Sequence, residues 1–484
     1  MGAGPVGLTA GLMLARHGTP VRIIDCNDAP TTLSKALVVW KRTLQVLDPV
    51  LPWEKFLEGH VVAKQGLFFQ GGKQVGTLSL ENKERCLPSG VLVPQNDTES
   101  ILISKLASYG VSIERNTKLV GFQTSNEHVT CNLSTGENVQ TPWLIGCDGA
   151  HSTVRHTLGL EFHGDTVNRR WVLADIVVKG DAPEGSIIME LGAKGLLALF
   201  PISANRWRVI ADAGPHEPGA KCSDPTIEEI QTILRERSSM QWVVRDTKWT
   251  GQFTVNERQV DNYVHGRVLL AGDAAHVHSP AGGQGMNTGM QDAVNLAWKV
   301  SLVERGCASA HLLQTYQDER HPIGAMVLKF TGRMLKASMI SNPVLRAAQG
   351  IGMHMALSVK AIQRHMAAFL SEDTINYRGG PLSAKSRGKF RPGDAFPDVD
   401  IDGNAATNLL RGNEATLFSS SSTMPAEFGR GGFPLTQVTS QAITEQFGGD
   451  VLVRPDGVIA VIGADAIEQW LHDLSFDDDA LTSG

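Results

Sequence analysis

The 484-residue sequence lacks several features that mark specialised classes of protein. No uninterrupted apolar stretch reaches the ~18 residues of a transmembrane helix, so we expect no membrane span. The net charge of −6 and the absence of lysine and arginine runs give no reason to expect a nucleic-acid partner. The six cysteines form no Cys-x-x-Cys pair, and we interpret them as reduced thiols of a cytoplasmic protein. They are Cys26, Cys86, Cys131, Cys147, Cys222 and Cys307.

The first 25 residues have the pattern of a unit that binds a dinucleotide. Gly2-Ala-Gly-Pro-Val-Gly7 leads into a predicted helix over 5–17, and a predicted buried strand over 21–24 ends at Asp25. In such a loop the first glycine permits a tight turn, the second lets a pyrophosphate approach, and the third allows close packing. Because the chain opens directly on this loop, we expect no signal peptide. Only Met1 precedes the loop, so we also expect the first strand of the unit to be missing.

A second glycine-rich stretch follows a predicted strand over 267–270. Asp273 comes after that strand, and a loop over 279–289 leads into a predicted amphipathic helix that continues to Leu302. The loop gathers backbone N–H groups at a helix N-terminus, which is a site for phosphate or another anionic group. Together with the first glycine loop, this stretch points to a bound dinucleotide.

The alternation of helical and strand-like segments divides the chain into four stretches. We predict an α/β, doubly wound dinucleotide-binding domain formed by 1–165 and 263–380, interrupted by an inserted β-sheet substrate domain over 166–262. A small α/β domain is predicted over 388–484, with a hairpin over 451–462 and a final helix over 464–474. The segment 417–434 is rich in serine and glycine, and we expect a mobile loop there.

These motifs resemble those of one flavoprotein family. Cys147-Asp-Gly-Ala-His-Ser-Thr-Val-Arg155 is similar to the Asp-Gly motif of aromatic hydroxylases that carry FAD, and the string from Asp273 through Asn287 to Lys299 is the most specific match. With Arg42-Thr-Leu, Leu92-Val-Pro-Gln95 and 316–322, the resemblance covers residues 2–340. The sequence is identified as a member of the class A FAD-dependent aromatic monooxygenases, the para-hydroxybenzoate hydroxylase and phenol hydroxylase-like family. The tail is similar to the thioredoxin-like domain of the longer branch, and without Cys-x-x-Cys we expect no redox role for it.

The resemblance implies a set of contacts with FAD. The glycine loop would hold the pyrophosphate, Asp25 the adenosine ribose and Asp273 the ribityl chain, while backbone amides of the second loop would face the pyrimidine edge of the flavin. Arg42 and Gln95 would reach the pyrophosphate and ribityl regions, and Pro280 would line the flavin ring. The complete set is Gly2, Gly4, Gly7, Asp25, Arg42, Gln95, Asp148, Asp273, Pro280, Gly283, Gly285, Met286 and Asn287.

The resemblance also implies the reaction. NADPH or NADH would reduce the flavin, and O₂ would then give a C4a-hydroperoxide that hydroxylates a small aromatic, phenolic substrate. The sequence identifies no catalytic residue: Tyr263 has a suitable chemistry, but nothing fixes its position. His276 and His278 have no carboxylate or cysteine to complete a ligand set, so we expect no metal site.

Three alternatives remain open at this point. The chain could be a flavin reductase or dehydrogenase that does not use O₂, or an inactive member of the FAD family whose missing first strand weakens cofactor binding. A flavin-dependent halogenase is disfavoured because the sequence has no Trp-x-Trp-x-Ile-Pro run. A homodimer is compatible with the sequence.

Overall fold

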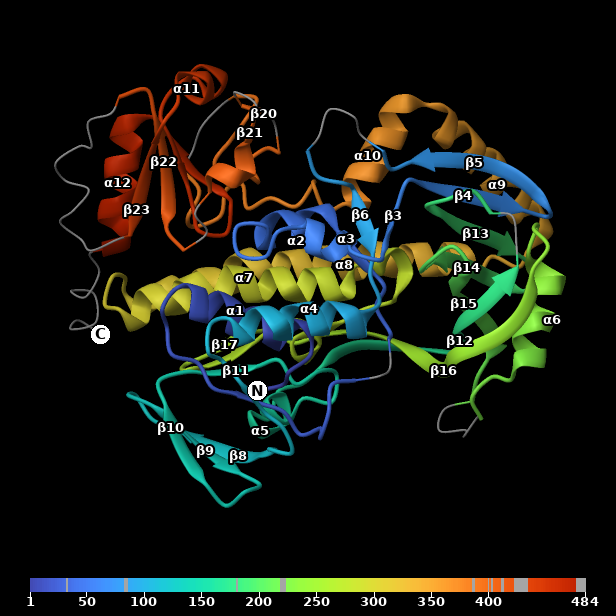
Figure 1. Cartoon of the computed structure of the whole chain (residues 1–484), viewed down its shortest axis with the longest axis horizontal. Helices are drawn as coiled ribbons and strands as arrows, with labels where there is room; N and C mark the ends of the chain where they lie inside the picture. Colours follow the sequence, from blue (N-terminus) through green and yellow to red (C-terminus); the bar gives the residue numbers. More distant parts are fainter. Residues whose placement is uncertain are drawn as a thin grey trace.

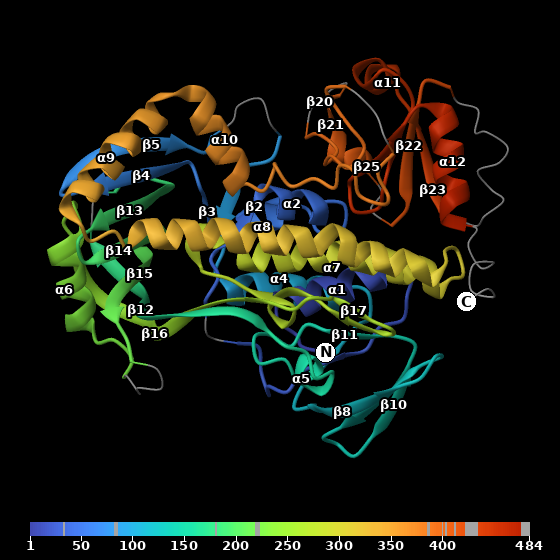
Figure 2. The same ribbon diagram turned by 180° about the vertical axis from the view of Figure 1, so that it is seen from behind.

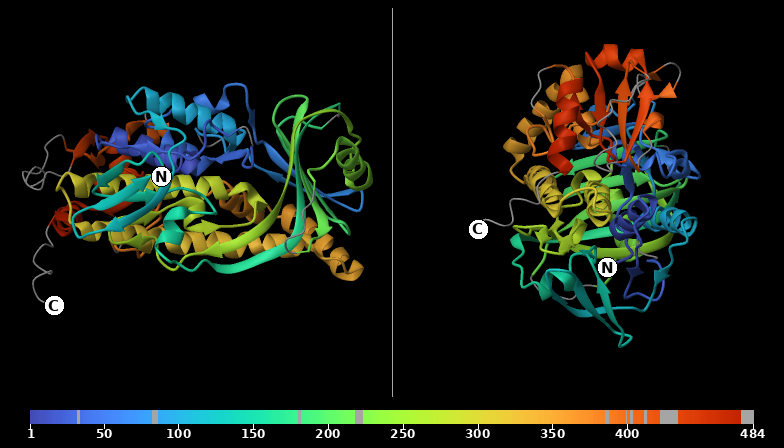
Figure 3. Two further views of the ribbon diagram at one scale, coloured as in Figure 1. Left: turned by 90° about the horizontal axis from the view of Figure 1, so that it is seen from below. Right: turned by 90° about the vertical axis from the view of Figure 1, so that its left-hand side faces the viewer.

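The computed structural model describes residues 1–31, 34–81, 86–179, 182–217, 223–384, 388–398, 400–401, 404–410, 413–421 and 434–475. Figure 1 shows an α/β lobe at the centre, a large sheet at one end and a C-terminal α/β domain at the other. The view from below in Figure 3 shows the same arrangement, with the sheet and the C-terminal domain far apart. The predicted α/β class is confirmed.

The central lobe is built from short parallel strands covered by helices. β1 (Ile23–Ile24) pairs in parallel with β7 (Ile113–Glu114), and β11 (Leu144–Gly146) pairs in parallel with β18 (Val268–Leu270). Helix α1 (Pro5–Arg16) packs against α4 (Gln95–Ala107) and α7 (Gly285–Glu304), as Figure 1 shows. The other elements of the lobe are β8 (Leu119–Thr124), β9 (Val129–Leu133), β10 (Asn138–Thr141), α5 (Thr153–Thr157) and β17 (Val264–His265).

Met1 and Gly2 lie between β1 and β11. The Met1 amine donates to the Ile145 carbonyl (2.9 Å), the Cys147 N–H donates to the Met1 carbonyl (2.8 Å), and the Gly2 N–H donates to the Ile24 carbonyl (2.9 Å). Next to Met1 is a cavity of about 390 Å³, lined mainly by apolar side chains of α1, β1, β9 and β11. Among the described residues no strand fills it. Met1 and Gly2 thus bridge β1 and β11 through backbone hydrogen bonds, and the cavity lies beside them.

An eight-stranded sheet forms the second body. Its order is β19-β16-β12-β15-β14-β13-β4-β5, and α6 (Ile227–Arg237) covers part of it. The sequence analysis did not expect residues 65–79 here: they form β4 and β5, and β4 pairs in parallel with β13. The strands are β4 (Gln65–Gln70), β5 (Lys73–Ser79), β12 (His163–Lys179), β13 (Ser186–Gly192), β14 (Gly195–Pro201), β15 (Arg206–Pro215), β16 (Val243–Gln259) and β19 (His276–Val277).

A small three-stranded sheet joins the lobe to the large sheet. It consists of β2 (Val38–Trp40), β6 (Gly90–Leu92) and β3 (Val61–Val62), and α2 (Lys41–Leu47) and α3 (Glu54–Leu57) follow β2 along the chain. Apolar side chains of this sheet pack in one cluster with residues of β13 and of the two helices over 343–358 and 360–370.

Four helices follow the second glycine-rich loop: α7 (Gly285–Glu304), α8 (Gln314–Ser338), α9 (Pro343–Ser358) and α10 (Lys360–Leu370). Figure 2 shows α7 and α8 side by side along the lobe. The prediction of an amphipathic α7 is wrong in one respect, because every residue from 286 to 302 is buried. Its polar side is covered by α8 and by the C-terminal domain. None of the helices in the described part of the chain combines the length and apolar character that a bilayer crossing requires.

The C-terminal domain has a four-stranded sheet of order β23-β22-β24-β25. β22 (Ala415–Ser419) and β23 (Leu435–Thr439) are parallel, whereas β24 (Val451–Val453) and β25 (Ile459–Ile462) form the predicted hairpin. The helices are α11 (Gln441–Phe447) and α12 (Ala464–Ser475). The expected mobile loop over 417–434 is wrong at its start, because 417–419 belong to β22; residues 422–433 lie outside the described residues.

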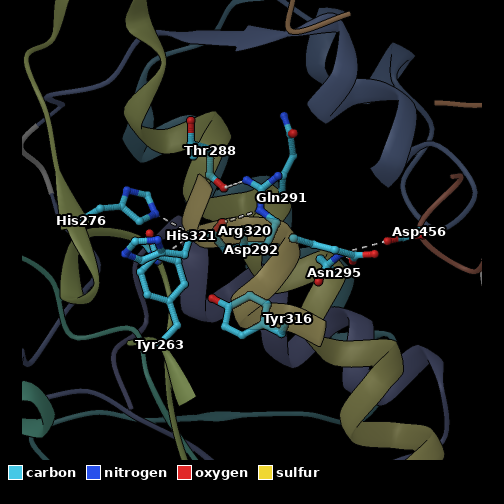
Figure 4. Close-up of polar contacts among 12 residues, drawn as sticks. Tyr263, His276, Thr288, Gln291, Asp292, Asn295, Tyr316, Arg320, His321 and Asp456 are labelled. Carbon is cyan, nitrogen blue, oxygen red and sulfur yellow. Dashed lines mark hydrogen bonds and ion pairs between the residues drawn. The ribbon is translucent and has the colours of Figure 1, made fainter. Parts of the chain in front are cut away.

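A fully buried ionic cluster joins this domain to the lobe. Glu319 on α8 accepts from Arg454 at 2.5 and 2.9 Å and from Lys299 of α7 at 2.8 Å. Asn295 of α7 donates to Glu319 and to Asp456, the contact drawn in Figure 4. Although burial opposes ionisation, Arg454 and Lys299 lower the pKa of the Glu319 carboxyl to about 2. Burial and the neighbouring Arg454 lower the pKa of Lys299 to about 8, although the Glu319 carboxylate opposes this shift.

Candidate functional site

The first glycine loop has one open side. A Cβ on Gly7 would lie 1.9 Å from the Gly2 carbonyl oxygen, and a Cβ on Gly2 (φ 94°) would lie 2.4 Å from that of Cys147. A Cβ on Gly4, by contrast, would meet nothing within 4 Å. Gly4 precedes α1 without a side-chain cap. The N-terminus of a twelve-residue helix is therefore open to an anion at Gly4, whereas the two flanking glycines are required by the fold.

The second loop packs directly against the first. Val6 in the first turn of α1 occupies the space beside Gly272 and Gly289, because a Cβ on either glycine would come within 2.7 Å of it. Gly272 and Gly289 flank the turn that carries Asp273 and the start of α7. The two glycine-rich stretches are 270 residues apart in sequence, and they meet at one place in the fold.

Asp273 lies on a short turn, Gly272–Ala274, at the end of β18. The Asp273 side chain is exposed to solvent. The protein atoms around it still remove part of its hydration, which raises the pKa of its carboxyl above the ordinary value. An exposed carboxylate at the carboxyl end of a parallel strand, next to the N-termini of two helices, is available to a hydroxyl-bearing ligand.

Asp292, a buried carboxylate of the motif string from Asp273 to Lys299 for which the sequence indicated no role, supports this turn. Asp292 of α7 accepts from the Gly272 N–H at 3.2 Å, from His276 Nε2 at 2.7 Å and from Arg320 Nε at 2.7 Å. Burial alone would raise the pKa of the Asp292 carboxyl, but Arg320 and His276 outweigh burial and lower it. Figure 4 shows these side chains converging on α7. The ionised Asp292 fixes the backbone immediately before Asp273.

The histidines of this region are structural. The His276 and His278 rings stack with their centroids 5.8 Å apart, and His276 is committed to Asp292. Burial lowers the pKa of His278 to about 3, so this ring is neutral at physiological pH. The described residues contain no cluster of three or more histidine, cysteine, aspartate or glutamate side chains that could hold a metal ion.

Tyr263 lies away from any open space. Its ring is buried and stacks on His276, and its hydroxyl accepts from Gln259 at 2.7 Å. Burial raises the pKa of this phenol well above its ordinary value. Tyr263, whose position the sequence did not define, therefore lies in the core, where its hydroxyl is unsuited to proton transfer with a ligand.

The loop from Pro280 to Asn287 is held by β2. The Trp40 indole N–H donates to the Gly282 carbonyl at 2.9 Å, and the Trp40 backbone N–H donates to Asn287 Oδ1 at 2.8 Å. Asn287 in turn donates to the Val38 carbonyl. The Asn287 side chain thus anchors the loop, Gly282 and Gly283 adopt φ of 81° and 63°, and Pro280 remains exposed.

Three other predicted residues lie around the first glycine loop. Asp25 accepts from the Ala3 N–H at 2.6 Å and from the Asn27 N–H at 2.8 Å, so its carboxylate already braces the loop. Asp148 caps the start of α5 through Ser152 and the Val154 N–H, beside Gly2. Gln95, the first residue of α4, is half-buried, and its side chain accepts from the Ala36 N–H.

The structure corrects the expectation for Arg42. Its guanidinium is buried and donates to Gln45 at 2.9 Å and to the Asp456 carbonyl at 3.1 Å. It therefore bonds to the turn between β24 and β25 instead of reaching a pyrophosphate. The sequence could not reveal this, because the partner lies 414 residues away in a separate domain.

Comparisons with known proteins agree with this geometry. Residues 1–331 match the family described as FAD binding domain. The chain is 32% identical over 504 residues to 6-methylpretetramide 4-monooxygenase of Streptomyces rimosus, across 96% of this chain and 90% of that protein. This chain belongs to the FAD-dependent aromatic monooxygenases. The named resemblance and the assignment as an FAD-dependent monooxygenase are thus confirmed.

Two further relatives place this monooxygenase within its family. Pentachlorophenol 4-monooxygenase of Sphingobium chlorophenolicum is 29% identical over 441 residues, across 87% of this chain and 79% of that protein. The solved structure of the OxyS anhydrotetracycline hydroxylase from Streptomyces rimosus superimposes with a TM-score of 0.79 at 28% identity and covers 98% of both chains. The likeness therefore extends beyond the FAD-binding part to the whole length of the monooxygenase.

The residues of this monooxygenase fit FAD. The open side at Gly4 and the exposed Asp273 are available to a ligand where the two loops meet, whereas a Cβ on Gly282 or Gly283 would already be in van der Waals contact with protein atoms at 3.5 Å. The flanking positions Gly2, Gly7, Gly272 and Gly289 are closed by protein atoms. Gly4 is therefore the one glycine of the first loop that the packing of the fold does not require.

Proposed function

We propose that this monooxygenase binds FAD across the junction of its two glycine-rich loops. The pyrophosphate would lie at Gly4, at the open N-terminus of α1, and the ribityl chain at Asp273. The N–H groups of Gly285, Met286 and Asn287 would face the pyrimidine edge of the flavin, and Pro280 its ring. The Gly283 N–H already donates to the Pro280 carbonyl at 3.0 Å, so Gly283 would shape the loop without donating to the flavin. The packing of Val6 against both Gly272 and Gly289 carries the proposal, because it brings the two loops to one place.

When bound, FAD would supply the oxygen chemistry, with NADPH or NADH as reductant and O₂ as the source of the transferred atom. The protein's part is positional. Partial positive charge on the amides at the start of α7 favours negative charge on the pyrimidine edge of the reduced ring. Asp292, fixed by Arg320 and His276, holds the Asp273 turn in place.

We propose that the substrate is an aromatic, phenolic compound that binds between the Pro280 loop and the large sheet. Half-buried apolar side chains meet there from several elements: Phe68 of β4, Met189 of β13, Phe200 of β14 and Met366 of α10. Trp40 and Leu370 connect this cluster to the loop, since Leu370 lies 3.5 Å from the position of a Cβ on Gly282. Such a lining suits a flat apolar ring. The relatives named for anhydrotetracycline and pentachlorophenol support this substrate class.

The test is oxygen incorporation. With FAD, NADPH or NADH and ¹⁸O₂, a phenol from a panel that includes anhydrotetracycline and pentachlorophenol should stimulate nicotinamide oxidation and oxygen uptake. Mass spectrometry should find one ¹⁸O atom in the product. Nicotinamide oxidation that proceeds equally well with an artificial acceptor under nitrogen, with no ¹⁸O in any aromatic product, would favour the reductase alternative instead.

We also propose that the cavity beside Met1 accommodates one more parallel strand. Met1 and Gly2 bond to β11 and β1 as the last residues of such a strand would, and the cavity between Val21 and Trp143 continues its path. A strand there would bury its apolar side chains against the apolar lining of the cavity and would stabilise the glycine loop it leads into.

Fusing an extended apolar segment of about five residues ahead of Met1 should therefore tighten FAD binding about tenfold, or ~1.4 kcal/mol. Flavin fluorescence titration measures the dissociation constant, and the thermal midpoint should rise with it. An extension of equal length made of glycine and serine is the control. Equal flavin affinity for the two extended proteins would show that the cavity is not a strand site.

We propose that the C-terminal domain is thioredoxin-like. The parallel pair β22–β23, the antiparallel hairpin β24–β25 and the order β23-β22-β24-β25 support this topology. The last cysteine of the sequence is Cys307, so the domain has no thiol and its role is structural. Its contacts with α2, α7 and α8 through Arg42, Asn295 and Glu319 hold those elements in place.

A further inference from the structure

Among the described residues, most of the exposed large apolar side chains lie on α9, on α10 and at the junction between them. Ten large apolar side chains are exposed among the described residues, and six of them fall between 344 and 362. The exposed fractions reach 75% for Val344, 62% for Ile351 and 60% for Met355. Figures 1 and 2 show both helices at the edge of the molecule, outside β4 and β5. We name the six side chains the outer face: Val344, Leu345, Ile351, Met355, Val359 and Ile362.

The outer face is a continuous stripe, distinct from the side of α9 that packs on the protein. Val344, Ile351 and Met355 follow the i, i+7, i+11 spacing of one helix face. The opposite side of α9 is used for packing: Leu357 is 4% exposed and contacts Gly76 of β5, and Gly350 faces Gln70 of β4. Because α9 is apolar on its packed side and on its exposed side, we infer that the exposed side binds a further surface.

The charged side chains of α9, of α10 and of the C-terminal part of α8 are all basic, although Glu257 of β16 packs beside Gly332 of α8 and interacts with Lys336. The 51 residues from His321 to Ser371 contain six basic side chains and no aspartate or glutamate, in a chain whose net charge is −6. The adjacent strands β4 and β5 add Lys73 and no acidic residue. The six are Lys329, Arg333, Lys336, Arg346, Lys360 and Arg364, and all but Arg346 are exposed.

We propose that the outer face docks on the surface of an anionic phospholipid bilayer. Apolar side chains that enter the boundary between headgroups and acyl chains, flanked by lysine and arginine, are the features of helices that lie in this interface. Each basic residue near an anionic surface adds to the attraction. The helices would lie on the bilayer without crossing it. The half-buried Met353 and Met366 of the same helices face the apolar cluster at the proposed substrate site, so docking would place that site near the lipid phase.

A second copy of the chain fits this surface less well. A two-fold interface brings the same patch of both subunits together. Here that would oppose two basic faces with no acidic residue to pair with. The charge therefore favours an anionic surface over a homodimer through α9 and α10.

The experiment uses the full chain and vesicles of defined composition. Flotation should recover the protein with vesicles of equimolar phosphatidylcholine and phosphatidylglycerol, but not with vesicles of phosphatidylcholine alone. Lys360→Glu combined with Arg364→Glu should lower the bound fraction about tenfold or more. Ile351→Ser combined with Met355→Ser should lower it to a similar extent. Because these side chains are exposed, the variants should keep the thermal midpoint of the parent.

The control is Val120→Ser combined with Val243→Ser, two exposed valines of the lobe and the large sheet. This variant should bind anionic vesicles like the parent. The proposal is overturned if the parent protein ignores anionic vesicles, or if both outer-face variants bind as the parent does. It is also overturned if light scattering shows that Ile351→Ser with Met355→Ser turns a dimer into a monomer while vesicle binding is unchanged or absent throughout.

Discussion

Replacing Gly4 with valine should abolish FAD binding at micromolar concentrations while leaving the apoprotein folded. In the structure a Cβ at Gly4 meets no protein atom within 4 Å, and φ of −77° with ψ of −178° is extended backbone that valine adopts readily. Only a ligand close to the helix N-terminus would oppose the new side chain. Loss of the close approach of pyrophosphate to the backbone should weaken FAD binding about a hundredfold, or ~2.7 kcal/mol.

Two variants make the result specific. Gly121→Val, at another glycine with nothing within 4 Å of its Cβ, should bind FAD like the parent. Gly7→Ala should lower the thermal midpoint, since its Cβ would overlap the Gly2 carbonyl oxygen. Flavin fluorescence gives the affinity, and circular dichroism gives the folded fraction of each apoprotein. A Gly4→Val protein that retains parental affinity would place the pyrophosphate somewhere other than the first glycine loop.

Removing the charge of Glu319 should cost about 3–5 kcal/mol of the free energy of unfolding, the range measured when one partner of a buried ion pair is deleted. Glu319→Gln leaves Lys299 and Arg454 buried with Asp456 as the remaining carboxylate of the cluster. The C-terminal domain should then detach from α7 and α8 more easily. Denaturation by urea, followed by tryptophan fluorescence, measures the loss.

Acid provides an independent check of the same group. The folded pKa of Glu319 is about 2, below its value near 4.3 in an unfolded chain. Its contribution to stability is therefore present above about pH 4 and is lost as the pH falls through about 2. The difference between Glu319→Gln and the parent should shrink over that interval. The neighbouring exposed Asp318→Asn is the matched control, and an equal loss in that variant would contradict a specific role for the buried pair.

Local features of this chain could be predicted from its sequence. The helix over 5–17, the strands over 21–24 and 267–270, and the hairpin over 451–462 form nearly where their patterns place them. Their signals lie within a few neighbouring residues: a glycine loop before an apolar helix, or a Pro-Asp-Gly turn between strands. The convergence of the two glycine-rich loops also follows from motif spacing, because the carboxyl ends of parallel strands share one edge of a sheet.

Interactions between distant segments could not be predicted. The polar residues Asn287, Gln291, Asn295 and Lys299 recur every four positions on α7, which is the pattern of a solvent-exposed face, yet all four are buried. Arg42 is in the same situation, since its carbonyl partners belong to the C-terminal turn. Residues 65–79 join the large sheet through pairing with β13, a partner more than 100 residues away. Single-sequence patterns report the polarity of a surface and carry no record of what covers it.

The two 17-residue strands β12 and β16 determine how the monooxygenase can deform. They pair from His163 opposite Gln259 to Lys179 opposite Val243, and β19, just after the Asp273 turn, pairs with the last residues of β16. Bending between the sheet and the lobe would stretch this ladder, and each backbone bond lost costs on the order of 1 kcal/mol. The long pairing of β12 with β16 therefore resists bending between the sheet and the lobe. Helices such as α9 and α10, which contact β5 without backbone pairing, can move relative to the sheet at a lower energetic cost.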